Sequence, residues 1–115
     1  MTKKETNKLD KMVREVIYER DGGQCMYCGK PGNNVHHIVG RRNRSTRWFE
    51  PNLITLCPSC HTFSTKSFHQ DPLETMAWFV AHYPDRYAKV MERKNKILKQ
   101  DYEAVCEEIL DSKVV

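Results

Sequence analysis

The chain has 115 residues, which allows one compact domain and excludes two full ones. Hydrophobic residues make up 39% of it, and no apolar run approaches the roughly 20 residues of a membrane span. The polar N-terminus lacks the apolar stretch of a secretory signal, so we expect a soluble, cytoplasmic protein that makes no contact with a membrane. Residues 1–70 hold 12 Lys and Arg against 6 Asp and Glu, whereas residues 71–115 hold 7 against 9. This uneven charge favours a polyanionic partner for the first part.

The first predicted element is an amphipathic helix within residues 1–24. The pair Gly22-Gly23 should end it, because glycine readily takes the left-handed conformation that closes a helix. Apolar residues recur before it with the three- and four-residue spacing of one helix face: Leu9, Met12, Val13, Val16 and Ile17.

Two short apolar runs predict a β-hairpin with a long loop. The run from Val35 to Val39 is rich in β-branched residues, and the run from Leu53 to Leu56 is expected to be the returning strand. The polar residues 40–51 would form the loop between them. The segment from Cys57 to His61 should then open a helix.

The remaining residues are predicted to be helical. Asp71, Pro72 and Glu74 form a start signal for a helix that ends near Pro84. An apolar stripe beyond it predicts a second helix of about 25 residues, which clamps over the domain or pairs with another copy. We therefore expect an N-terminal helix (1–24), a core (25–70) and a helical extension (71–115) in one compact domain. The residues of the stripe are Tyr87, Val90, Met91, Ile97, Leu98, Tyr102, Val105 and Ile109.

Four of the five cysteines have the spacing C-x2-C-x28-C-x2-C, and they are Cys25, Cys28, Cys57 and Cys60. Thiolates are soft ligands suited to tetrahedral Zn²⁺, and a closed four-sulfur site leaves no position for a substrate, so its role should be structural. A redox pair and two coincidental pairs are the alternatives, but a redox pair would sit in a thioredoxin-like context that the chain lacks. Cys106 is expected to be an ordinary buried cysteine.

The segment between the cysteine pairs contains two adjacent histidines, His36 and His37, and His61 follows the last cysteine. Adjacent residues of a strand point to opposite faces, so the two histidines cannot share one task. One can bind a metal on the side of the following helix, where His61 could join it, while the other faces the substrate. The cysteine site would then hold a second, open metal site together.

These residues together resemble the HNH endonuclease motif in its zinc-knuckle form. The resemblance implies a ββα-metal core with four-Cys zinc knuckles. With the predicted N-terminal helix and two C-terminal helices flanking this core, we expect an α+β fold. The small size and an Arg-rich loop are similar to small phage and prophage HNH nucleases. The resemblance covers roughly residues 25–65 and rests on Cys25-x-x-Cys28, Val35-His36-His37-Ile38, Asn52-Leu53 and Leu56-Cys57-x-x-Cys60-His61.

The resemblance also implies a role for each matching residue in hydrolysis of DNA to 5′-phosphate and 3′-hydroxyl ends. His36 and His61 would hold one catalytic divalent ion, His37 would be the general base, and Asn52 would hold the loop that orients this base. His69 is a possible further ligand or phosphate contact, if the helix after His61 continues that far. The ion is expected to be Mg²⁺ or Mn²⁺, although histidine ligands also admit Ni²⁺, Co²⁺ or Zn²⁺.

The loop after the first strand concentrates positive charge. Guanidinium groups suit phosphate oxygens, so we expect this loop to bind double-stranded DNA without reading its sequence. The following residues, Trp48 and Phe49, should anchor the loop. The predicted DNA contacts are Arg41, Arg42, Arg44 and Arg47.

Two other interpretations remain open from the sequence. The chain could be a zinc-finger module that binds nucleic acid without cutting it, with His36 and His37 as basic or core residues. It could also be an interaction protein whose long C-terminal helix forms a homodimer or docks onto a phage protein in DNA packaging, recombination or a restriction-like process.

Overall fold

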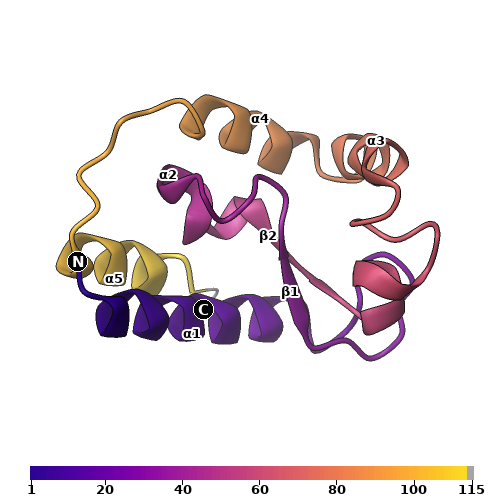
Figure 1. The fold of residues 1–115 in the computed structure, drawn as a ribbon, viewed down its shortest axis with the longest axis horizontal. Coiled ribbons are helices and arrows are strands. Elements are labelled where there is room, and N and C mark those ends of the chain that lie inside the picture. Colours follow the sequence, from indigo (N-terminus) through magenta and orange to yellow (C-terminus); the bar gives the residue numbers. More distant parts are fainter. Residues whose placement is uncertain (114–115) are drawn as a thin grey trace.

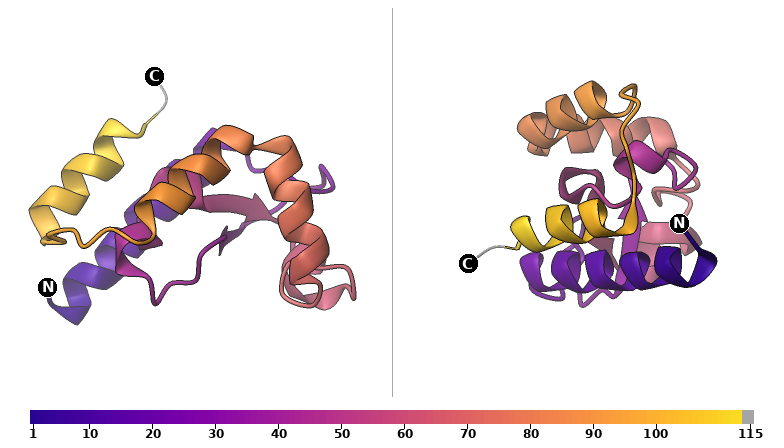
Figure 2. Two further views of the ribbon diagram at one scale, coloured as in Figure 1. Left: turned by 90° about the horizontal axis from the view of Figure 1, so that it is seen from above. Right: turned by 90° about the vertical axis from the view of Figure 1, so that its left-hand side faces the viewer.

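The computed structural model describes residues 1–113, in which helices lie on both sides of a two-stranded hairpin (Figure 1). Helices α1 (Lys3–Arg20) and α5 (Tyr102–Asp111) run side by side on one side of the hairpin (Figure 2). Helices α3 (Pro72–His82) and α4 (Pro84–Arg93) lie on the other side. The fold is α+β, as the sequence predicts. No helix within the described residues combines the length and apolar character needed to cross a membrane.

Helix α1 ends where its sequence predicts, and a capping box fixes its start. The Thr2 hydroxyl accepts a hydrogen bond from the Glu5 backbone N–H at 3.1 Å, and the Glu5 carboxylate accepts one from the Thr2 N–H at 2.8 Å. This reciprocal capping box satisfies two backbone donors at the start of the helix. After the last turn, Gly22 and Gly23 have φ angles of 66° and 68°, which end the helix. The long helix therefore provides a fixed support for the hairpin.

The hairpin consists of β1 (Asn34–His37) and β2 (Leu53–Leu56), which pair antiparallel. His37, the last residue of β1, lies opposite Leu53, the first residue of β2. The strand predicted to reach Val39 therefore ends two residues earlier, at the point where the loop begins. Both histidines of the pair lie at this loop end of the hairpin.

The loop between the strands, expected to be irregular, contains two short elements. They are helix α2 (Arg44–Arg47) and the 3₁₀ turn η1 (Glu50–Asn52). Trp48 lies between them and is buried, so it anchors the loop as predicted. Helix α4 packs against both elements from the opposite side.

The buried apolar side chains form two clusters that meet at β2. Leu53 belongs to the first and its neighbour Ile54 to the second, because successive strand residues face opposite sides. The first cluster lies between α1, α5 and the hairpin and contains Leu9, Val13, Val16, Ile17, Trp48, Leu53, Val105 and Ile109. The second surrounds the cysteines and contains Cys25, Ile54, Leu56, Cys57 and Phe68.

The structure corrects the prediction of one long helix after residue 84. Helix α4 ends at Arg93, and α5 begins only at Tyr102. The predicted apolar stripe has a gap of six residues between Met91 and Ile97, and Ile97 is fully exposed. The extension after residue 70 thus has three described helices instead of the predicted two.

Contacts with the rest of the chain explain this break. The Asn43 side chain donates to the Lys94 carbonyl at 2.8 Å and so caps the end of α4. The Asp101 carboxylate caps the start of α5. The Arg93 guanidinium joins the two helices by binding both carboxylate oxygens of Glu108, at 2.7 and 2.8 Å. As a result α5 packs its buried residues Val105 and Ile109 on α1.

Candidate active site

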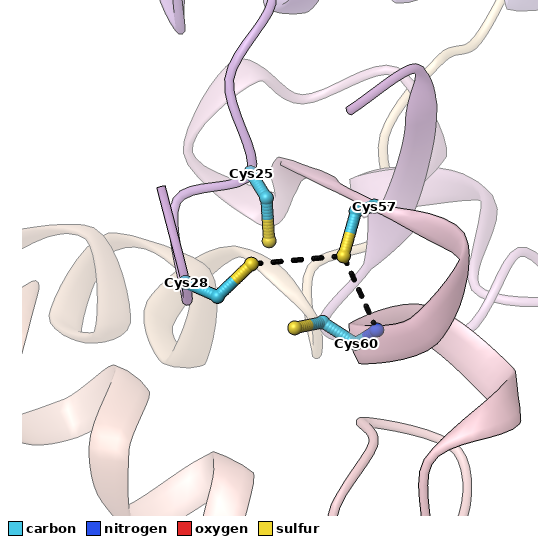
Figure 3. A group of neighbouring side chains, drawn as sticks. All are labelled: Cys25, Cys28, Cys57 and Cys60. Atoms are coloured by element: carbon cyan, nitrogen blue, oxygen red, sulfur yellow. Dashed lines mark hydrogen bonds between the residues drawn. The ribbon is translucent and has the colours of Figure 1, made fainter. Parts of the chain in front are cut away.

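The four predicted zinc ligands converge from two turns at the end of the hairpin away from the histidine pair (Figure 3). The four sulfur atoms lie within 4.8 Å of one another, and those of Cys28 and Cys57 are 3.7 Å apart. The Cys60 backbone N–H donates to the Cys57 sulfur at 3.4 Å and lowers the pKa of that thiol to about 7. A thiol that ionises easily is a good metal ligand. Four sulfurs in this arrangement are suited to a structural Zn²⁺ ion.

Three histidines from separate segments of the chain meet in a second group of potential metal ligands. His36 comes from β1, His61 from the short π-helical turn η2 (Ser59–Phe63), and His69 from the segment that follows. Their ligand nitrogens lie within 4.8 Å of one another, and the Nε2 atoms of His61 and His69 are 2.9 Å apart. The structure therefore places the possible third residue, His69, beside the predicted pair. We call these three residues the histidine cluster.

His69 reaches the cluster by a loop, and the helix that its prediction assumed ends earlier. Element η2 stops at Phe63, after which the chain turns back on itself. The Phe68 backbone N–H donates to the Cys60 carbonyl at 2.8 Å, and the His69 N–H donates to the His61 carbonyl at 3.2 Å. The Phe68 side chain is buried in the second apolar cluster. This anchored loop thus brings His69 to the same place that a continuing helix would have reached.

Two imidazoles of the histidine cluster, those of His36 and His61, are held neutral at pH 7. Burial, together with the charges of His61 and His69, lowers the pKa of His36 to about 3. Burial and the charge of His69 also lower the pKa of His61. A neutral imidazole offers a lone pair to a cation, whereas a protonated one does not. The geometry of the cluster and the neutral rings of His36 and His61 therefore fit a metal ion.

The His37 ring contacts the loop, whereas the His36 ring faces the other two histidines of the cluster. Strand alternation predicts this difference. Its Nε2 atom lies 3.0 Å from the Arg47 carbonyl oxygen, which can only accept a hydrogen bond. Nε2 therefore carries the proton, and Nδ1 keeps a free lone pair. Burial lowers the pKa of His37, so the ring is neutral at pH 7.

The Asn52 side chain binds the backbone of the loop at two points. The side chain is fully buried, and its amide donates to the carbonyls of Val39 at 3.0 Å and Thr46 at 3.1 Å. Its carbonyl oxygen accepts from the Val39 backbone N–H at 2.8 Å. Thr46 directly precedes Arg47, whose carbonyl binds His37. Asn52 therefore acts on the ring of His37 through the loop backbone.

The histidine cluster and His37 line one cleft of ≈ 390 Å³. Helix α1, the hairpin, the loop and the segment around His69 form its walls. Three cationic side chains also line it, namely Arg41 and Arg42 from the loop and Arg14 from α1. The cleft is thus a place where a phosphate group would meet both positive charge and a candidate metal site.

Asp10 of α1 takes part in this region, although nothing in the sequence singles it out. Its carboxylate accepts hydrogen bonds from the guanidinium of Arg47 at 2.6 and 3.0 Å, from Arg41 at 2.8 Å and from the Trp48 indole at 2.8 Å. The Arg47 side chain is only 15% exposed. The guanidinium of Arg47, a predicted DNA contact, thus anchors the loop to α1, and its contact with DNA stays a prediction. Arg44 is exposed and stacks over the Trp48 ring.

Comparison with known proteins gives a match for the central part of the chain. Residues 25–67 match the family model described as HNH endonuclease. The match contains both cysteine pairs and the histidines His36, His37 and His61, and it ends just before His69. No curated protein and no solved structure matches the chain.

Proposed function

We propose that this chain, which carries an HNH endonuclease domain at residues 25–67, is a metal-dependent endonuclease that hydrolyses phosphodiester bonds of DNA. The observation that carries the proposal is the histidine cluster with the neutral ring of His37 beside it in one cleft. Hydrolysis of a phosphodiester needs a group that accepts the proton of water and a positive charge that stabilises the oxygens of the reacting phosphate.

His37 is the general base in this proposal. Because its Nε2 atom is bound to the Arg47 carbonyl, Nδ1 takes the proton from the attacking water. The water oxygen forms a bond to phosphorus while the bond to the 3′ oxygen breaks. The departing 3′ oxygen takes a proton from solvent water, which leaves 5′-phosphate and 3′-hydroxyl ends. Asn52 is a positioning residue, since it holds the loop that orients His37.

The histidine cluster is the proposed site of the catalytic ion. When bound, a divalent ion there supplies positive charge to the non-bridging and departing oxygens of the phosphate. His36, His61 and His69 would hold it through imidazole nitrogens. Imidazole ligands suit Zn²⁺ and Ni²⁺ better than Mg²⁺, which prefers oxygen. The three histidines therefore favour a transition metal over the Mg²⁺ expected from two ligands alone.

A plasmid assay tests the proposal. Supercoiled DNA is incubated with zinc-loaded protein and a series of added ions (Mg²⁺, Mn²⁺, Co²⁺, Ni²⁺ and Zn²⁺), and nicked and linear products are measured. We expect His37→Ala to lower the rate about 10²–10⁴-fold, as is typical for loss of a general base. His82→Ala is the matched control, because His82 is exposed on α3 and does not line the cleft.

Two outcomes would contradict the proposal. One is a failure to cut DNA with any of the ions, and the other is a His37→Ala variant that cuts at the wild-type rate. Binding of DNA without cleavage would instead support the zinc-finger interpretation.

A separate measurement tests His69 as a metal ligand. We expect His69→Ala to weaken binding of Ni²⁺ at the histidine cluster by at least about 10-fold in calorimetric titration. Lys66→Ala, an exposed change in the same loop, should leave the affinity unchanged. Equal affinities of His69→Ala and wild type would remove His69 from the site.

A further inference from the structure

Helix α1 lies outside the HNH match, yet it forms one wall of the cleft. Asp10, Val13 and Arg14 line the cleft on this side. Asp10 and Arg14 are four residues apart and so share one face of the helix. Packing of α1 on the hairpin and on α5 is accounted for by its buried apolar residues. The Arg14 side chain on the cleft face is thus not needed for this packing.

The cationic groups around the cleft differ in how far they are already paired. Arg47 is committed to Asp10, and Arg41 shares the same carboxylate while its side chain remains 58% exposed. Arg14 and Arg42 are exposed, and among residues 1–113 neither forms an ion pair. The unpaired positive charge of the cleft therefore comes from one residue of α1 and one residue of the loop.

We infer that Arg14 and Arg42 form a two-sided clamp for the DNA backbone, binding phosphates next to the one held at the histidine cluster. This inference rests on the proposed function for the identity of the ligand. Guanidinium groups bind phosphate oxygens with two parallel hydrogen bonds, and such contacts fix the position of a duplex without reading its sequence. Arg14 stands on a capped helix, so it offers a fixed point opposite the loop.

In this clamp Asp10 is a positioning residue. By binding Arg47 and Arg41, its carboxylate ties the loop to α1 and so sets how the loop bearing Arg42 lies relative to Arg14. Helix α1 is then a functional part of the nuclease site, although it precedes the matched domain. Nothing in the amphipathic pattern of α1 predicts this, because Arg14 is one of several charged residues on its polar side.

Binding of DNA measured apart from cleavage tests the clamp. Fluorescence anisotropy of a labelled duplex is recorded over a range of salt concentrations, with the zinc-loaded protein and no other divalent ion. We expect Arg14→Gln and Arg42→Gln each to weaken binding roughly fivefold at 0.15 M salt and to reduce the slope of log K against log salt by about 0.9. Lys89→Gln is the matched control, because Lys89 is exposed on α4 and does not line the cleft.

The outcomes separate the clamp from the proposed function. A salt slope of Arg14→Gln equal to that of wild type would overturn the clamp, even if the plasmid is cut. Loss of affinity and slope in Arg14→Gln but not in Lys89→Gln would support the clamp, even if no added ion produces cleavage. Circular dichroism of each variant confirms that an altered affinity does not reflect loss of the fold.

Discussion

Replacing Asn52 with alanine should remove the link that holds the long loop against β1. The side chain has no exposure to solvent and makes three hydrogen bonds, two to Val39 and one to Thr46. Alanine would leave a backbone N–H and two carbonyl oxygens without these partners in the interior. It would also leave a small cavity beside them.

The expected cost follows from these three bonds. Leaving a buried polar group without its partner costs about 1–3 kcal/mol, so three such groups correspond to about 3–5 kcal/mol after partial relaxation. This is a large share of the roughly 5–15 kcal/mol that stabilises a typical domain. Asn33→Ala is the matched control, because Asn33 is exposed and its loss should change stability by less than about 0.5 kcal/mol.

The same substitution should affect catalysis more than metal binding. A loosened loop moves the Arg47 carbonyl away from Nε2 of His37, so the general base loses its fixed orientation. The histidine cluster takes no residue from the loop and should keep its affinity for Ni²⁺. Urea unfolding at fixed Zn²⁺ measures the stability, and plasmid nicking well below the melting temperature measures the rate. A destabilised Asn52→Ala variant that cuts at the wild-type rate would refute the positioning role.

Three further changes test other contacts. Asp10→Ala should lower the free energy of unfolding in urea by about 2–3 kcal/mol, because Arg47 and Trp48 lose their hydrogen-bond acceptor. Asp10→Asn keeps one side-chain oxygen and should lower it by less. Removal of zinc should unfold the core around the cysteines and abolish the near-UV circular dichroism. Added Zn²⁺ should restore the signal, whereas Mg²⁺ should not. An unchanged spectrum of the zinc-free protein would contradict this expectation. Without added divalent ion, the free energy of unfolding should fall by about 2 kcal/mol between pH 7 and pH 5 through His36 alone. The pKa of His36 is 6.5 in the unfolded chain and about 3 in the folded protein, so over this range only the unfolded state gains the proton. His36→Gln should show a smaller fall over the same pH range.

Much of the site could be predicted because its parts depend on local spacing. Two cysteines separated by two residues present both sulfurs from one tight turn, whatever surrounds them. Adjacent histidines on a strand face opposite sides, which separates His36 from His37. The ends of α1 and the start of α3 follow from capping residues within a few positions of each boundary.

The remaining features depend on residues that are far apart in the sequence. Asp10 and Arg47 are separated by 36 residues, and no local pattern marks them as partners. The chain breaks between α4 and α5 because α4 packs on the loop between the strands, whereas α5 packs on α1. The apolar stripe in the sequence has members on both sides of this break and does not mark it. Tertiary contacts therefore override a helical periodicity that is only a weak preference.

By itself the sequence determined the α+β class, the four-cysteine cluster and the opposite orientation of the two adjacent histidines, because short-range geometry decides each of these. Only the tertiary structure decided that His69 joins His36 and His61, since a loop held by the buried Phe68 carries it there. The tertiary structure likewise decided which arginines remain free for a substrate. One carboxylate on α1 holds two of them, and such a pairing exists only once the helix and the loop have come together.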